Sequence, residues 1–75
     1  MNLSTKQEQL ALEIAHALGD MESLQVHRKF VSTYSEDYLR NKLTKALAIP
    51  ESQIRKSRGA LYTSLVVGYK HNNGR

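Results

Sequence analysis

The residues best suited to chemistry in this chain are three cations and a hydroxyl within four positions, Arg55, Lys56, Ser57 and Arg58. Gly59 and a strongly apolar run follow them directly. If that run is a helix, its first turn has backbone N–H groups without intrahelical partners and the positive end of the helix dipole. Phosphate is the anion that fits such a start best. We therefore predict a phosphate contact at this cluster, where Gly59 allows close approach of a backbone.

The distribution of charge supports this functional interpretation. Residues 1–37 contain six acids and three Lys or Arg, a net −3, whereas residues 38–75 contain one acid and eight Lys or Arg, a net +7, which together give +4. Asymmetry of this size points to a polyanionic partner. The structural alternative is a basic loop before the last helix, with Arg58 packed along Tyr62.

A second set of polar side chains falls on one side of a predicted helix over 36–48. At about 100° per residue, Tyr38, Asn41, Lys42 and Lys45 lie opposite the apolar residues of that helix. Lys and Tyr contact phosphates, and Asn pairs with adenine edges, when a helix enters a major groove. A solvated helix face explains the same residues equally well. The predicted nucleic-acid-binding set is Arg40, Asn41, Lys42, Lys45, Arg55, Lys56, Ser57 and Arg58.

Metal sites and catalytic constellations have little support in the sequence. Glu13 and His16 have the i, i+3 spacing of carboxylate-bridged helical sites, but no second pair of this kind exists. His27 and His71 are isolated, and we expect partly exposed histidines at all three positions. Walker and dinucleotide glycine patterns are missing, and no Ser lies in a nucleophile-elbow context. We predict a non-enzymatic protein without a metal or cofactor.

The length of 75 residues predicts one small domain over 1–70, followed by a flexible polar tail at 71–75. No cysteine is present, which fits a reducing cytoplasm and excludes disulfides and thiolate zinc sites. We expect no signal peptide, because no apolar segment follows a basic N-terminus. No apolar stretch approaches the roughly 18 residues of a membrane span, so no membrane partner is expected.

The first helix is predicted over 5–18. Ser4 or Thr5 is a suitable N-cap, and Thr5 with Glu8 has the spacing of a capping box. Gly19 fits the left-handed residue that ends many helices. The apolar stripe of this helix recurs at i, i+4 and i+8 and consists of Leu10, Ile14 and Leu18.

Two further helices are predicted over 24–33 and 36–48, with Ser23 and Ser35 as their N-caps. Pro50 ends the third helix, because the residue before a proline is pushed away from helical geometry. Residues 50–54 are expected to form a single turn. The apolar face of the third helix is predicted to consist of Leu39, Leu43, Ala46 and Leu47.

The last element allows two interpretations. As a helix from about Arg58, it places Leu61, Leu65 and Tyr69 in one row and Tyr62 and Val66 in the next. As a hairpin over 54–67, it forms the wing of a winged helix, which its Thr and Val content favours. We prefer the helix. The predicted fold is a mainly α, compact bundle of about four short helices, with a helix-turn-helix-like arrangement as one form and the winged helix as alternative.

The function that these observations favour is nucleic-acid binding through the basic C-terminal half, with duplex DNA preferred over RNA. The alternative is a protein-interaction or accessory domain whose acidic N-terminal half meets a basic partner. The four tyrosines are interpreted as core-edge residues, with base stacking as the alternative. Sequence specificity and oligomeric state stay open.

Overall fold

A computed structural model describes residues 3–68 of the chain. Its elements are α1 (Thr5–Leu18), the 3₁₀ turn η1 (Met21–Ser23), α2 (Leu24–Thr33), α3 (Glu36–Ala48), the 3₁₀ turn η2 (Glu51–Gln53) and α4 (Arg58–Val66). The predicted mainly α fold of four short helices is confirmed. The alternative hairpin over 54–67 is wrong, because α4 occupies most of this range and the described part of the chain contains no strand. Tyr69 and the predicted tail 71–75 lie outside the described residues.

The start and end of α1 follow from local hydrogen bonding. The hydroxyl of Ser4 accepts from the backbone N–H of Gln7, and the Gln7 side chain accepts from the Ser4 backbone N–H. Ser4 and Gln7 therefore form the capping box. The prediction that Thr5 and Glu8 form it was wrong. Gly19 ends the helix in the left-handed conformation, with φ of 64° and ψ of 37°, as predicted.

The other helices start in two different ways. Ser35 caps α3 by accepting from the backbone N–H of Tyr38, and Ser57 caps α4 by accepting from that of Ala60. Ser23, in contrast, makes no capping hydrogen bond, so this prediction was wrong. The turn η1 leads directly into α2, and the Ser23 backbone has left the extended conformation that an N-cap serine needs.

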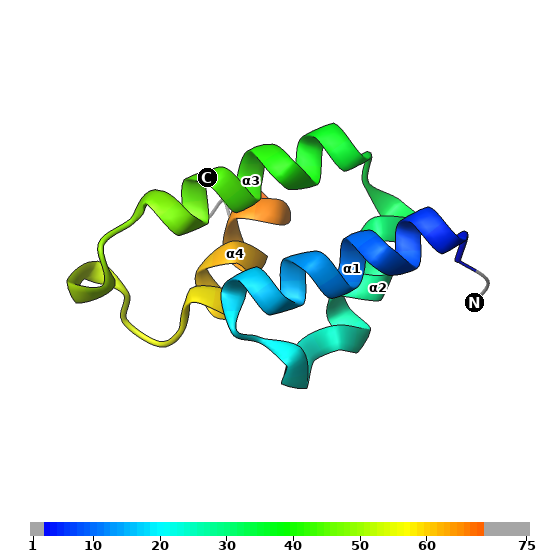
Figure 1. The fold of residues 1–75 in the computed structure, drawn as a ribbon. Coiled ribbons are helices and arrows are strands. Elements are labelled where there is room, and N and C mark those ends of the chain that lie inside the picture. The colour runs from blue at the N-terminus through cyan, green and yellow to red at the C-terminus, as the bar shows by residue number, and fades with distance from the viewer. Residues whose placement is uncertain (1–2, 69–75) are drawn as a thin grey trace.

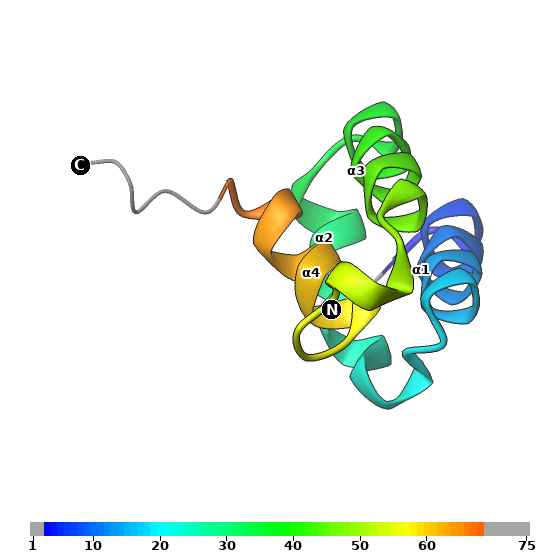
Figure 2. The same cartoon turned by 90° about the vertical axis from the view of Figure 1, so that its left-hand side faces the viewer.

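The four helices surround one core. α1 and α3 run side by side in the same direction, and α2 and α4 both lie on the other side of this pair (Figures 1 and 2). Within residues 3–68, α1 packs mainly on α2, and α3 packs mainly on α4. None of the described helices is long and apolar enough to cross a membrane.

The core contains mostly the apolar residues that the helical spacing predicts. Leu47 is an exception, because 45% of its surface is exposed at the edge of α3. His27 is the second exception: it is fully buried, whereas a partly exposed side chain was expected. The buried apolar residues are Leu10, Ala11, Ile14, Ala15, Leu18, Phe30, Val31, Leu39, Leu43, Ala46, Tyr62 and Val66.

Candidate nucleic-acid interface

Arg58, one of the predicted phosphate-binding residues, is bound to the end of α3. Its Nη1 donates to the carbonyl oxygens of Ala46 at 2.6 Å and Ile49 at 2.9 Å. The last carbonyls of a helix have no intrahelical donors, and a guanidinium at this end also interacts favourably with the helix dipole. Arg58 thus fastens the start of α4 to the end of α3, and it is only half-exposed.

Arg55 and Lys56 lie in the connection between η2 and α4, and both side chains are exposed. Their neighbour Ser57 is occupied as the N-cap of α4, with a distance of 3.0 Å between its Oγ and the Ala60 nitrogen. An open cleft of about 610 Å³ adjoins this connection. It is lined by Gln53, Ile54, Arg55, Lys56, Ser57, Ala60, Leu61 and Ser64.

Arg40 lies on the side of α3 that faces α1. Its Nη1 and Nη2 donate to the two carboxylate oxygens of Glu13 at 2.8 and 3.0 Å, and its Nε donates to Glu36 at 2.7 Å. The hydrogen bonds from Arg40 lower the pKa of the Glu13 carboxyl below its ordinary value. Two acids therefore already neutralise this predicted site residue.

The opposite side of α3 faces α4. Tyr38 donates its hydroxyl to the carbonyl oxygen of Val66 at 2.6 Å, which places this side of α3 against the end of α4. Lys42, one turn further on, holds its Nζ 5.0 Å from the centre of the Tyr38 ring. Asn41 and Lys45 belong to the same helical stripe and are exposed. The structure thus separates Arg40 from Asn41, Lys42 and Lys45.

The tyrosines are engaged within the fold. The rings of Tyr34 and Tyr38 stack at 5.0 Å with an interplanar angle of 17°, and Lys42 also covers Tyr38. Tyr62 is fully buried and donates to the carbonyl oxygen of Leu39 at 3.3 Å. These three rings are therefore committed to packing, which favours the core-edge interpretation over a platform for unpaired bases.

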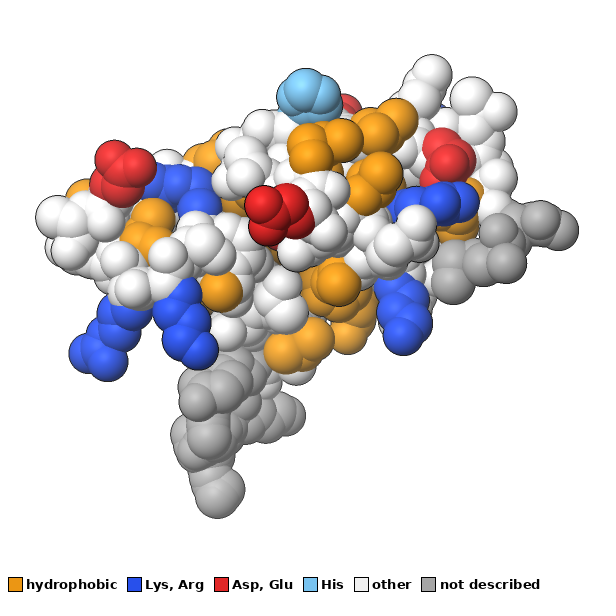
Figure 3. Space-filling view, turned by 90° about the horizontal axis from the view of Figure 1, so that it is seen from below, with side chains coloured by type: hydrophobic (Ala, Val, Ile, Leu, Met, Phe, Trp, Pro, Cys, Tyr) orange, Lys and Arg blue, Asp and Glu red, His pale blue; other side chains and the backbone are white. Residues whose placement is uncertain are grey.

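Most acids of residues 1–37 are paired, whereas most of the lysines and arginines of the described residues are not. Four of the six acids in residues 1–37 contact a cationic or histidine partner: Glu8, Glu13, Asp20 and Glu36. Within residues 3–68, no acid pairs with Lys42, Lys45, Arg55 or Lys56, and none pairs with Lys6 or Lys29 on α1 and α2. Lys and Arg side chains project from the molecule at the left of Figure 3, beside exposed hydrophobic groups. In Figure 1 this end carries η2 and the connection to α4.

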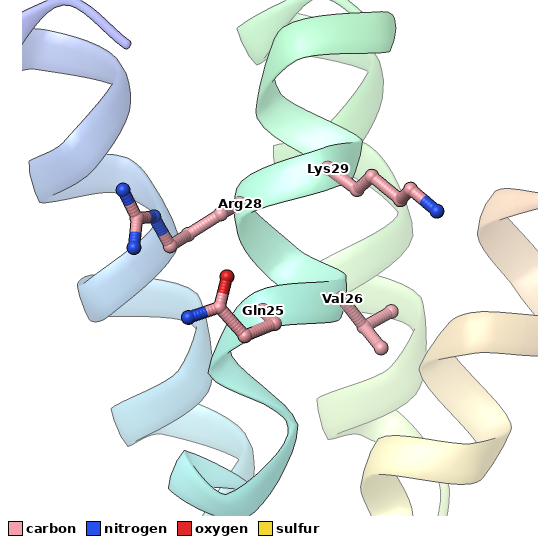
Figure 4. A pocket seen from close by; sticks show the side chains of 4 residues that line it. All are labelled: Gln25, Val26, Arg28 and Lys29. Atoms are coloured by element: carbon pink, nitrogen blue, oxygen red, sulfur yellow. The ribbon is translucent and has the colours of Figure 1, made fainter. Parts of the chain in front are cut away.

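A second hollow, of about 400 Å³, lies on α2 and is lined by Gln25, Val26, Arg28 and Lys29 (Figure 4). Gln25 and Arg28 point toward α1, whereas Val26 and Lys29 point the other way. The Nε of Arg28 lies 2.9 Å from Glu8, at an angle that makes an ionic contact and no hydrogen bond. Because its polar groups diverge, this hollow offers no convergent site.

A partly buried polar contact that the sequence did not reveal lies beside the start of α4. The Nε2 of His27 is 3.1 Å from Oδ2 of Asp20, while its Nδ1 is buried without a hydrogen-bond partner among the described residues. The His27 ring packs between Phe30 and Tyr62. Asp20 in turn lies so close to Gly59 that a Cβ there would collide with its carboxylate. Neither Asp20 nor His27 belongs to a recognisable motif, so no sequence signal marked this contact.

The described residues contain no cluster suited to metal binding. Between residues 3 and 68, no three His, Cys, Asp or Glu side chains are close enough together to share a metal ion. Glu13 is instead held by Arg40, and His16 is exposed on α1. His71 lies outside the described residues.

Comparisons of the chain with protein-family models, with curated proteins and with solved structures found no match. The function is therefore inferred from the residues and the geometry of this chain alone.

Proposed function

We propose that this domain binds duplex nucleic acid, with DNA as the preferred partner, through the stripe of α3 that carries Asn41, Lys42 and Lys45 and through the connection that leads into α4. The observation that carries the proposal is that four cations of these two elements, Lys42, Lys45, Arg55 and Lys56, have no acidic partner within residues 3–68. Phosphate contacts supply most of the affinity in non-specific binding of nucleic acid, and Lys and Arg side chains make them.

Arg40 and Arg58 have other roles in this proposal. Arg40 is neutralised by Glu13 and Glu36, and Arg58 holds the end of α3. Asn41 stays the residue for contact with a base edge, because it is exposed on the same stripe as Lys45. In a helix-turn-helix-like arrangement α3 enters the groove, while Arg55 and Lys56 lie against the flanking phosphates.

Duplex is preferred over single-stranded nucleic acid because of the tyrosines. Proteins that bind single strands stack bases on exposed aromatic rings. In this fold Tyr34 and Tyr38 stack on each other, and Tyr62 is buried. The available groups are cations and an amide, which suit phosphates and groove edges.

The test is a two-dimensional NMR titration of labelled protein with a mixed-sequence DNA duplex, at low and then moderate salt. We expect shifts centred on residues 41–45 and 55–57 that weaken as salt is added. A single strand of the same sequence and length should cause smaller shifts of these signals. No change with duplex at low salt, or changes confined to α1 and α2, would overturn the proposal.

A further inference from the structure

The cleft between η2 and α4 is lined in part by aliphatic side chains, which we call its floor and which phosphate binding does not use. Ile54, Ala60 and Leu61 line it together with the cationic residues Arg55 and Lys56. Ile54 and Leu61 are half-exposed, and Ala60 is exposed. A nucleic-acid backbone would contact the cations and leave this apolar surface in water, whereas a side chain of matching chemistry would cover it.

The charges around the cleft define what its occupant carries. Arg55 and Lys56 are exposed and have no acidic partner within the described part of the chain. Glu51 is the single acid among residues 38–75, and it lies in η2 before the connection. Cationic and aliphatic side chains that line the same cleft complement an aliphatic side chain with carboxylates on either side.

We propose that this cleft docks an acidic protein segment that inserts one aliphatic side chain, such as Leu or Ile, between the α4 surface and the connection. The aliphatic group contacts Ile54, Ala60 and Leu61, and the flanking carboxylates meet Arg55 and Lys56. The inference rests on the proposed function in one respect: the segment and the nucleic acid share these two cations, so their binding is mutually exclusive. An acidic segment of this type would release the domain from nucleic acid.

The size of the cleft limits the strength of this interaction. Its lining residues all come from the last residue of η2, the connection after it and the first two turns of α4. Such a surface accepts one anchor residue and not a complete helix face. We therefore expect weak binding with fast exchange, which makes NMR the suitable method.

The test uses three synthetic peptides of about twelve residues. The first has Glu and Asp around a central Leu, the second replaces this Leu by Ser, and the third keeps the Leu but replaces the acids by Gln and Asn. We expect the first to shift the amide and methyl signals of Ile54, Ala60 and Leu61. The other two should bind about tenfold more weakly or not at all, because each lacks one of the two interactions.

A variant of the cleft floor separates this inference from the proposed function. Ala60 is exposed in the first turn of α4, so Ala60→Gln fills the floor without changing the charge or the fold. We expect this variant to lose the first peptide and to keep its affinity for duplex DNA. The control is a double variant, Lys6→Ala with Lys29→Ala, on α1 and α2. It should bind both the first peptide and duplex DNA as the unmodified protein does.

The outcomes are distinguishable. Equal binding of the Leu and Ser peptides, or retention of the Leu peptide by Ala60→Gln, would overturn the docking inference while leaving duplex binding untouched. Binding of the Leu peptide by a protein that ignores duplex DNA would sustain the inference and overturn the proposed function. In the expected case, added duplex displaces the peptide.

Discussion

At the scale of single residues, the contact between Gly59 and Asp20 shows why a helix can require glycine at an ordinary dihedral angle. A Cβ at Gly59 would collide with the Asp20 carboxylate, which is fixed because His27 holds it. His27 is fully buried, so the carboxylate cannot move away without leaving a buried ring nitrogen unpaired. The requirement for glycine is therefore set by a hydrogen bond between two other residues.

We expect Gly59→Ala to lower the free energy of unfolding by roughly 1–3 kcal/mol, the cost of a buried polar group that loses its partner. In an Asp20→Ala background the same substitution should cost nothing or stabilise by about 1 kcal/mol, because alanine is the better helix former. Urea unfolding of the four proteins measures this double-mutant cycle. An equal cost in both backgrounds would show that Asp20 is not the obstacle.

Tyr62 is the second residue whose burial has a measurable consequence. Burial, together with the nearby charge of Tyr38, raises the pKa of its hydroxyl well above the ordinary value of 10.0. The neutral form is thus favoured in the folded state, and the resulting stability is present below pH 10.0 and lost as the pH rises above it.

When the pH is raised from 8 to 11, we expect Tyr62→Phe to lose less of its folding stability than the unmodified protein loses. The variant lacks the ionising group but keeps the buried ring and its contacts with His27 and Phe30. Thermal melting of both proteins at the two pH values measures the difference. If both lost the same stability, ionisation of Tyr62 would not contribute to alkaline unfolding.

At the scale of secondary-structure elements, the contacts of Arg58 show that this residue of the basic cluster has a structural role within the fold. Its bonds to Ala46 and Ile49 cap α3, while Arg55, three residues earlier, is exposed. Two arginines that look equivalent in sequence therefore differ in their contacts within the fold.

We expect Arg58→Met to lower the free energy of unfolding by roughly 1–3 kcal/mol, because it removes charge-assisted bonds to two carbonyls. Arg55→Met should leave stability within about 0.5 kcal/mol, as is usual for an exposed residue, and should weaken duplex binding. Urea unfolding and DNA titration of both variants measure the two effects. The reverse result, with stability lost at Arg55 and duplex binding lost at Arg58, would contradict this division of roles.

The contact between α1 and α3 depends on pH through Glu13. Arg40 lowers the pKa of Glu13 below 4.5, so the pair stabilises the fold above pH 4.5 and this contribution disappears as the pH falls through the lowered value. We expect Arg40→Met to reduce stability slightly at pH 7 and not at pH 2, because both side chains are exposed and solvent weakens the pair. An undiminished difference between variant and unmodified protein at pH 2 would point to packing instead.

The elements themselves were predictable because their signals are local. Ser35 and Gly19 mark helix boundaries through hydrogen bonds to residues nearby in the chain, and Pro50 marks one by restricting the residue before it. The spacing of apolar residues marks the buried faces. The roles of Arg58 and His27 were not predictable, because their partners belong to other elements. Leu47 has the right spacing for burial, yet it sits at the edge of the face that meets the core.

At the scale of the whole molecule, pairing between elements decides which charges remain available to a ligand. Arg28 and Arg40 are neutralised by acids of other turns or helices, and Arg58 is bound to carbonyls. What remains on the α4 side of α3 and beside the cleft is a smaller set than the net charge of residues 38–75 suggests. We therefore propose fewer binding residues than the sequence predicted, because most of these contacts join different elements and are not visible in the sequence.

The central claim is that Lys42, Lys45, Arg55 and Lys56 meet phosphates. With four such contacts, the logarithm of the association constant for duplex DNA should fall against the logarithm of salt concentration with a slope of roughly −3 to −4. Arg55→Ala with Lys56→Ala should reduce the steepness of this slope by about 2. Lys6→Ala with Lys29→Ala changes the net charge equally, but on α1 and α2, and should leave the slope unchanged.

The decisive measurement is therefore the salt dependence of duplex binding, followed by fluorescence anisotropy, for these three proteins. A steep slope for the unmodified protein and the control, with a shallower one for the Arg55 and Lys56 variant, is the predicted result. A flat response in all three, or the same loss of slope in both double variants, would contradict the assignment of phosphate binding to this surface.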